Sequence, residues 1–435
     1  MWAGIPMVSN AVALIPRDIL SRFSPRRSPD MPDFRKSSPA VMLACASVIL
    51  TLALGIRHSF GLFLQPMSMD NGWGREVFGF AVALQNLLWG ITQPFTGMLA
   101  DRFGARRVLF AGGLLYALGL VLMANSTTAL GLTLAIGIFV GIGMSCTTFN
   151  IVFGALGRAY SAERRSVVLG IASAAGSFGQ FAVLPLALVL ISGLGWYSAL
   201  IALSILVAVV MPASFGVADK GYHGTLAAGA GVSLKEALAE AFRHKGFWLL
   251  GVGYFACGFQ VVFIGTHFPA FLMDQGLTVR DGTISLALIG LFNIFGSYLA
   301  GQLGGRFSKT YLLSGLYAAR GVAIALLLAF PLTPVSAYLF AAAMGFLWLG
   351  TVPLTNGVVA GIFGVKHLAM LSGFVFFFHQ LGSFFGGWLG GYLFDRTGSY
   401  QLVWLIAIGL SVISVVVNLP IDERPVKRAG EAVAA

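Results

Sequence analysis

The chain has 435 residues, of which 57% are hydrophobic and only 10% carry a charge, and its formal net charge is +11. Because soluble domains carry roughly 25% charged residues, this composition excludes an ordinary soluble protein and indicates an integral membrane protein. The positive charge would also suit a nucleic-acid partner, unless the basic residues follow a membrane topology.

The first 40 residues are predicted to form a disordered cytoplasmic N-terminal tail. Their basic residues are Arg17, Arg22, Arg26, Arg27, Arg35 and Lys36. These charges follow the first apolar stretch, whereas a signal peptide carries its charges before that stretch. Both Met1 and Met31 are compatible with the start of translation.

Twelve apolar runs follow, each close to the length of about 20 residues that crosses roughly 30 Å of hydrocarbon. They predict an all-α integral membrane fold. The predicted transmembrane helices cover residues 41–65, 77–100, 108–124, 129–156, 166–192, 196–216, 246–273, 282–304, 309–330, 334–362, 368–394 and 400–420.

The sequence repeats itself at a shift of about 203–206 residues, so that Arg57 corresponds to Gln260 and "GMLADRFG" at Gly97 corresponds to "GQLGGRFS" at Gly301. Parallel six-helix repeats suit a carrier whose two halves rock against each other, so we expect two pseudo-symmetric six-helix bundles. In chain order, the predicted parts are the tail 1–40, the first bundle 41–216, a cytoplasmic linker 217–245, the second bundle 246–420 and a cytoplasmic C-terminal tail 421–435.

Basic residues concentrate on one side of the predicted membrane. If the N-terminus is cytoplasmic, 22 of the 27 lysines and arginines fall in inner segments, and only Arg75, Arg280 and Arg396 fall in outer ones. This asymmetry follows the positive-inside rule. We therefore expect a multi-pass protein of a bacterial cytoplasmic (inner) membrane with both termini cytoplasmic, and no nucleic-acid partner.

The link between the second and third helices, "GMLADRFGARRVL", places four charges in a short turn. Its pattern residues are Gly97, Asp101, Arg102, Gly104, Arg106 and Arg107. One alternative is that such a loop merely anchors the membrane topology. However, the order Gly-x-Leu-Ala-Asp-Arg-x-Gly resembles the signature loop of the major facilitator superfamily. The twelve helices and the internal repeat extend the resemblance over residues 41–420.

This resemblance implies a secondary transporter that works by alternating access, with the signature loop at its cytoplasmic gate. Asp101 would interact with the start of the eleventh helix, where the helix dipole favours a negative charge, and with Arg164 or Arg165. In the second copy of the loop, Gly305 stands where the acid would be.

Two longer stretches resemble one branch of that superfamily, which contains monocarboxylate transporters and oxalate/formate exchangers. They are "GWGREVFGFAVALQNLLWG" after the first helix and "GGYLFDRTGSYQLVW" around the end of the eleventh. Members of this branch often place a basic residue in the eighth or eleventh helix for the substrate carboxylate. Here the eighth helix has no lysine or arginine, and the eleventh offers only His379.

Two arginines, Arg57 and Arg320, fall inside predicted helices with no carboxylate deep in the membrane to neutralise them. Such a charge costs of order 2.5–3.5 kcal/mol by insertion scales and marks a functional site by default. We expect Arg57 to face the central cavity and bind an anionic substrate, and a side chain that reaches the outer surface is the alternative. For Arg320, bonding to carbonyls or tyrosines competes with a second anion contact.

Other candidates for substrate binding are buried polar residues, namely Gln260, His267, His379, Asn150 and Asn293. Gln260 and His267 would bracket the substrate opposite Arg57, or form ordinary interhelical hydrogen bonds. His379 is the best candidate for a titrating group because histidine titrates near neutral pH, and a packing role is its alternative.

Catalytic patterns are absent from the sequence, which has no H-E-x-x-H, no carboxylate pair within a helix and no nucleotide-binding loop. The three cysteines Cys45, Cys146 and Cys257 are isolated in separate apolar runs, so we expect them to pack as small hydrophobic residues. We expect no enzyme activity, cofactor, metal or ATP.

These features predict a secondary transporter for a small organic anion, in particular a monocarboxylate, moved by proton symport or anion exchange. The expected partners are this small-molecule substrate and the lipid bilayer, and the expected state is a monomer. Two alternatives remain: a carrier for a neutral or aromatic solute such as a vitamin or drug, with Arg57 purely structural, and a membrane sensor that does not transport.

Overall fold

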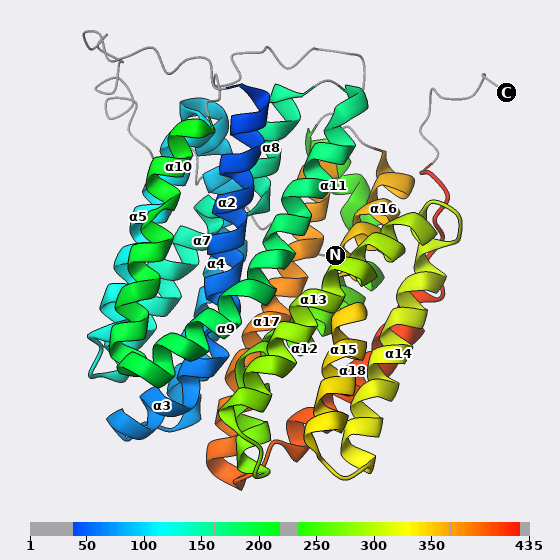
Figure 1. Cartoon of the computed structure of the whole chain (residues 1–435). Coiled ribbons are helices and arrows are strands. Elements are labelled where there is room, and N and C mark those ends of the chain that lie inside the picture. Colours follow the sequence, from blue (N-terminus) through cyan, green and yellow to red (C-terminus); the bar gives the residue numbers. More distant parts are fainter. Residues whose placement is uncertain (1–37, 161, 218–233, 365–367, 427–435) are drawn as a thin grey trace, which may run out of the picture. The chain divides into compact units, whose positions relative to one another are not determined.

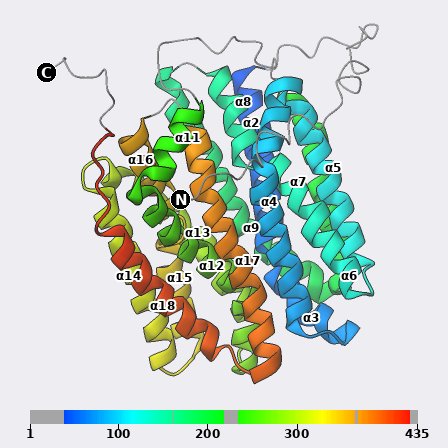
Figure 2. The same cartoon turned by 180° about the vertical axis from the view of Figure 1, so that it is seen from behind.

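The computed structural model describes residues 38–160, 162–217, 234–364 and 368–426, in which the regular elements are all helices. The helices of residues 39–216 gather on one side of Figures 1 and 2, and those of residues 234–418 gather on the other. Nearly all of the predicted N-terminal tail, most of the linker and the end of the C-terminal tail lie outside the described residues.

The first half is built from one chain segment that crosses the predicted membrane six times. Its helices are α2 (Pro39–His58), α3 (Gly61–Asn71), α4 (Arg75–Phe103), α5 (Ala105–Ala124), α6 (Ala129–Leu132), the π-helical η1 (Thr133–Val140), α7 (Gly141–Thr147), α8 (Phe149–Ala159), α9 (Ala162–Ala208) and α10 (Val210–Gly216). Within α9, Gly195 has a φ of 78°. Glycine adopts this left-handed conformation without strain, so the chain kinks there between two predicted crossings.

The second half begins after the linker, whose described part contains the short helix α11 (Leu234–Arg243). Its remaining helices are α12 (Lys245–Asp274), α13 (Val279–Gly304), α14 (Lys309–Ala329), α15 (Pro334–Phe346), α16 (Thr351–Phe363), α17 (Leu368–Thr397) and α18 (Gln401–Asn418).

Nine described helical stretches are long and apolar enough to cross a membrane. One of them, Val168–Gly216, has 49 residues and extends over two predicted crossings, one on each side of Gly195. The helices α4 and α17, with 29 and 30 residues, are not among the nine. With these two added, the helices match the twelve predicted crossings of a multi-pass membrane protein.

Two helix pairs connect the halves along much of their length, because α4 packs on α17 and α9 packs on α13. Small residues let membrane helices approach closely. A Cβ added at Gly79 of α4 would lie 2.5 Å from the carbonyl oxygen of Gly387, and one at Gly391 of α17 would lie 2.5 Å from that of Arg75. This packing of the halves therefore requires glycine at both positions.

Four crossings are interrupted in the described part of the chain, and interrupted helices often form the binding sites of transporters. The first crossing breaks between α2 and α3, the fourth at the extended residue Thr148, the sixth between α9 and α10, and the tenth between α15 and α16. At the repeat shift of about 203–206 residues, Thr148 corresponds to residues 351–354, the first turn of α16 directly after the break in the tenth crossing. Arg57 lies in the last turn of α2, directly before the first break.

Candidate functional site

A narrow cavity of about 10 Å³, with room for about one water molecule, lies between the two halves. Its lining comprises Arg57, His58, Phe60, Val82 and Gln85 of the first half, and Val261, Val262, Gly265 and Thr266 of the second. The polar part of this lining comes mainly from α2 and α4, while α12 supplies mostly apolar surface. A small molecule held by these residues would contact both halves at once, after the halves had separated enough to admit it.

Arg57 brings a positive charge to the cavity. One terminal nitrogen donates to Asn86 Oδ1 at 2.5 Å, and the guanidinium carbon lies 5.6 Å from the centre of the Trp89 ring, which is a cation–π distance. Its Nε has no hydrogen-bond partner, and no carboxylate pairs with it in the described part of the chain. The charge is therefore held in the protein interior with unused donor capacity.

Gln85 is a lining residue that the sequence analysis missed. Its side chain is fully buried, and neither its Oε1 nor its Nε2 has a hydrogen-bond partner among the described residues. An unsatisfied buried polar group costs about 1–3 kcal/mol, which a bound ligand could recover. The signal was available in the sequence, because Gln85 and Asn86 form a polar pair inside an otherwise apolar stretch.

His58 is a second lining residue that the sequence analysis did not single out. Its Nε2 lies 3.4 Å from the carbonyl oxygen of Leu286 in α13 of the other half. Because a carbonyl only accepts, this nitrogen carries the proton. Its ring also meets Trp348 edge to face, with ring centres 6.5 Å apart. His58 therefore connects the halves beside Arg57.

His379 of α17 is joined to Arg57 by a hydrogen-bonded chain across the halves. Gln380 Nε2 donates to the backbone oxygen of Asn86 at 2.9 Å, so its Oε1 faces His379 Nδ1 at 3.1 Å and accepts from it. Asn86 in turn accepts from Arg57. In the neutral ring Nε2 is then an unprotonated acceptor with no nitrogen or oxygen partner in the described structure, and the Cys257 thiol of α12 lies within hydrogen-bonding reach of the ring.

Gln260 and Arg320 lie together inside the second half, away from the cavity lining. Arg320 is fully buried. It donates to the carbonyl oxygen of Leu347 at 2.6 and 3.0 Å, to that of Trp348, and to Gln260 Oε1 at 3.3 Å. It therefore satisfies carbonyls at the break between α15 and α16. Gln260 also donates to Ser411 at 2.7 Å, so both side chains are used internally.

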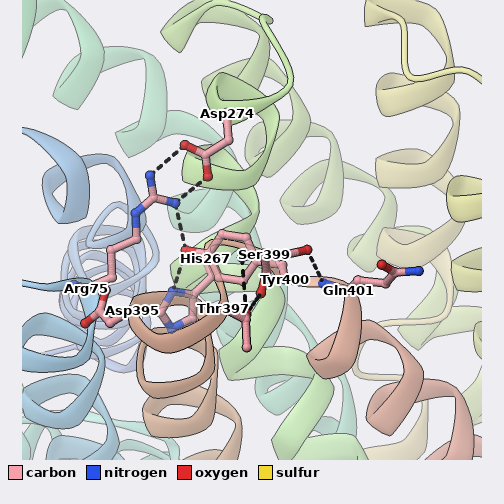
Figure 3. A network of polar contacts seen from close by, with 8 residues as sticks. All are labelled: Arg75, His267, Asp274, Asp395, Thr397, Ser399, Tyr400 and Gln401. Carbon is pink, nitrogen blue, oxygen red and sulfur yellow. Dashed lines mark hydrogen bonds and ion pairs between the residues drawn. The ribbon is translucent and has the colours of Figure 1, made fainter.

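His267 belongs to a polar network at the end of the molecule that carries the turn before α4; we call this the Arg75 end (Figure 3). Its Nε2 donates to the carbonyl oxygen of Gly387 at 2.8 Å. In the neutral ring Nδ1 then accepts from the Tyr400 hydroxyl at 3.2 Å, which itself accepts from Arg75 at 3.0 Å. Both ring nitrogens are therefore used by protein groups rather than exposed to the cavity.

Arg75 is the hub of this network and connects the halves. Its guanidinium binds both oxygens of Asp274, at 2.5 and 2.6 Å, and its Cζ lies 3.9 Å from the centre of the Phe394 ring. The next residue, Glu76, accepts from Trp388 at 3.1 Å and pairs with Arg396 at 3.4 Å. Bidentate arginine–carboxylate pairs are among the stronger polar contacts, so the halves are well connected at this end.

The two asparagines lie in different surroundings. Asn293 of α13 donates to Ser177 of the other half at 3.3 Å, and its Oδ1 accepts from the backbone nitrogen of Leu349 at 3.1 Å. It therefore connects α9, α13 and the break before α16. Asn150 lies in the first turn of α8 and is exposed. Neither asparagine is part of the cavity lining.

The signature loop forms the turn between α4 and α5. Gly104 has a φ of 87° at this reversal, a conformation that favours glycine. Arg102 and Arg107 are exposed, and Arg106 lies over the Phe215 ring at 5.3 Å. The side chains of Asp101, Arg164 and Arg165 and the segment 365–367 are outside the described part, so the predicted contact of Asp101 stays a prediction.

Two halves of six crossings each, meeting around a polar cavity, define the class of membrane carriers. The family model of the Major Facilitator Superfamily matches residues 41–360, and the chain belongs to this superfamily of transporters. It is therefore a transporter with a small-molecule substrate rather than an enzyme, as the signature loop predicted.

Several known proteins are similar over most of their length. The uncharacterized MFS-type transporter YcxA of Bacillus subtilis (strain 168) is 25% identical over 88% of this chain and 96% of its own. Monocarboxylate transporter 11 of Mus musculus is 27% identical over 84% of this chain and 83% of its own. The oxalate:formate antiporter of Oxalobacter formigenes is 25% identical over 89% of this chain and 93% of its own. These similarities confirm the predicted resemblance to that branch.

The fold is also that of a solved transporter. A bacterial homologue of the human lysosomal transporter Spinster, in an inward-facing and occupied conformation, matches 90% of this chain and 95% of its own with a TM-score of 0.65 at 16% identity. This likeness confirms the predicted twelve-helix fold.

The surroundings of the two buried arginines predict different effects of their loss. Replacing Arg320 by Gln removes donors from buried carbonyls of Leu347 and Trp348, at about 1–3 kcal/mol for each unsatisfied group. We expect Arg320→Gln to lower the unfolding temperature of the purified protein in detergent clearly, and Arg57→Gln to leave it near the wild-type value. Tryptophan fluorescence during heating measures both. Equal destabilisation by the two substitutions would contradict this distinction.

Proposed function

We propose that this secondary transporter carries a small organic anion, with Arg57 as its main contact. The observation that carries the proposal is the Arg57 guanidinium, which lines a cavity between the halves, has no carboxylate partner among the described residues and keeps an unpartnered Nε. A charge in the membrane is costly unless it is paired. An anionic substrate would supply the missing charge.

The remaining cavity lining supports a small substrate with few polar groups. Gln85 offers one donor and one acceptor that the described residues leave unused, while Phe60, Val82 and Val262 provide apolar walls. A carboxylate on Arg57 with a short apolar remainder would match these groups once the halves separate enough to admit it, and a monocarboxylate is the simplest such molecule. The carboxylates in the names of the relatives, monocarboxylate transporter and oxalate:formate antiporter, support the same class.

Transport would follow from the position of the cavity. Its lining comes from α2 and α4 of one half and α12 of the other, so rocking of the halves would expose a bound anion to each side in turn. The distribution of basic residues supports a cytoplasmic location for the signature loop and both termini, in a bacterial inner membrane. The Arg75 end would then face outward.

His379 is the proposed proton-binding residue if transport is coupled to protons. Its Nε2 is a buried acceptor with no nitrogen or oxygen partner among the described residues, and the Cys257 thiol lies beside the ring. The bonds through Gln380 and Asn86 connect the ring to Arg57. Protonation would add a positive charge to the membrane interior. A bound anion would offset that charge, so proton and anion would stabilise each other in the carrier.

The proposal predicts that transport of small carboxylates requires the charge of Arg57. In liposomes preloaded with mixed small carboxylates, we expect wild-type counterflow and at least about a tenfold loss in Arg57→Gln, because a hydrogen bond to a charged group contributes about 1.5–3 kcal/mol. Arg280→Gln, which removes an exposed charge at the Arg75 end, is the matched control and should transport normally. Full activity in Arg57→Gln would contradict the proposed contact and favour a neutral solute.

The role of His379 predicts a separation between exchange and proton-driven uptake. In His379→Gln, we expect anion exchange at equal pH to persist and uptake driven by an imposed pH gradient to fall to the level without a gradient, because glutamine cannot take up a proton. His244→Gln, in the turn before α12, is the control. Gradient-driven uptake that survives in His379→Gln would place the proton elsewhere.

A further inference from the structure

The motif of the signature loop occurs twice in the chain, at opposite ends of two neighbouring helices. The pattern Gly-x-Leu-x-Asp-Arg-x-Gly is "GMLADRFG" at residues 97–104 and "GYLFDRTG" at residues 391–398. The first copy ends α4 and the second ends α17. This second copy differs from the weak repeat at Gly301, because it keeps both the acid and the arginine.

The acid of the second copy, Asp395, caps the first turn of a helix in the other half. Its Oδ1 accepts from the backbone nitrogen of Arg75 at 2.9 Å, and its Oδ2 accepts from that of Glu76 at 2.7 Å. The α4 N-cap residue itself is Gly74, which has no side chain for this purpose. A carboxylate at a helix N-terminus satisfies free N–H groups and is favoured by the helix dipole.

The neighbouring residues Gly74 and Arg396 support the contact between Asp395 and α4. A Cβ added at Gly74 would lie 2.2 Å from Oδ2 of Asp395, so only glycine leaves room for the carboxylate. The arginine that follows, Arg396, pairs with Glu76 of α4, and Arg75 binds Asp274 (Figure 3). The second motif thus joins the end of α17 to the start of α4 through both its acid and its arginine.

The opposite end of the same helix pair has fewer close contacts. A Cβ at Gly97 of α4, or at Gly373 of α17, would meet no atom within 4 Å, whereas Gly79 and Gly391 nearer the Arg75 end have almost no space. The structure therefore joins the halves at the Arg75 end, whereas Gly97 and Gly373 near the other end make no such close contact.

We propose that the second motif, residues 391–398, is a latch that holds the Arg75 end closed, and that it works in opposition to the signature loop at the other end. Because α4 and α17 run in opposite directions, the motif that ends each helix lies at the end where the other helix begins. Asp395 caps α4 when the Arg75 end is closed. Asp101 would play the corresponding role at the start of α17 when the signature-loop end is closed.

Hydrogen–deuterium exchange of the purified, substrate-free protein tests this latch without depending on the proposed substrate. The informative peptides are α3 and residues 261–268 of α12, which meet across the halves at Gly61 and Gly265. Neither is bonded to Asp395 in the described structure. In Asp395→Asn, we expect deuterium uptake in these peptides to rise about twofold or more as the end opens, and uptake near residues 97–103 to fall.

Two further variants separate a latch from a local cap. Gly74→Ala, which displaces the carboxylate and keeps its charge, should give the same change as Asp395→Asn. Asp281→Asn removes an acid that caps α13 within one half, so it should leave α3 and residues 261–268 unchanged. An increase confined to the first turn of α4, or equal effects of Asp281→Asn, would overturn the latch.

The opposition between the two motifs has its own test. Adding Asp101→Asn to Asp395→Asn should return uptake in α3 and residues 261–268 toward the wild-type level, because both ends then lose their acid. A double variant that stays as open as Asp395→Asn alone would refute the pairing of the two motifs.

Discussion

The charge of Arg57 is held in the protein interior by one amide oxygen and one aromatic ring, without a described carboxylate. Asn86 accepts one hydrogen bond from it and Trp89 lies within cation–π distance. These partners orient the guanidinium but do not neutralise it. The break after α2, the unsatisfied amide of Gln85 and the cross-half bond of Gln380 all lie around this cation, which no described carboxylate neutralises.

The two halves treat their buried arginines in opposite ways, and the internal repeat makes the comparison direct. In the first half Arg57 lies on the first crossing, and the position that corresponds to Arg320 is Tyr116, which bonds to the carbonyl of Ala53. In the second half the first crossing carries Gln260, and Arg320 fills its donor capacity with Gln260 and the carbonyls at a helix break. Arg320 thus stabilises the helix break of the second half, while Arg57 keeps an unpartnered Nε that could bind a ligand.

The sequence was sufficient for the fold, because long apolar runs, the repeat and the loop around Asp101 are local patterns. The sequence also singled out Arg57 as a candidate, since a lone charge in an apolar run is conspicuous without coordinates, and its role in binding stays a prediction. The sequence could not show that Gln260 and His267 lie outside the cavity lining. Their hydrogen-bond partners Arg320 and Tyr400 lie 60 and 133 residues away along the chain. Gln85 was missed although the polar pair Gln85 and Asn86 stands out in its apolar stretch, because only the structure shows that the buried amide of Gln85 has no described partner.

The central claim is that the cavity recognises a negative charge through Arg57, and equilibrium binding tests it most directly. Isothermal titration of the purified protein with a panel of small carboxylates and their isosteric amides compares charge at nearly constant shape. We expect at least one carboxylate to bind, its amide to bind at least about tenfold more weakly, and Arg57→Gln to remove this difference. Equal binding of acid and amide, or a preference for the acid that persists in Arg57→Gln, would contradict the account.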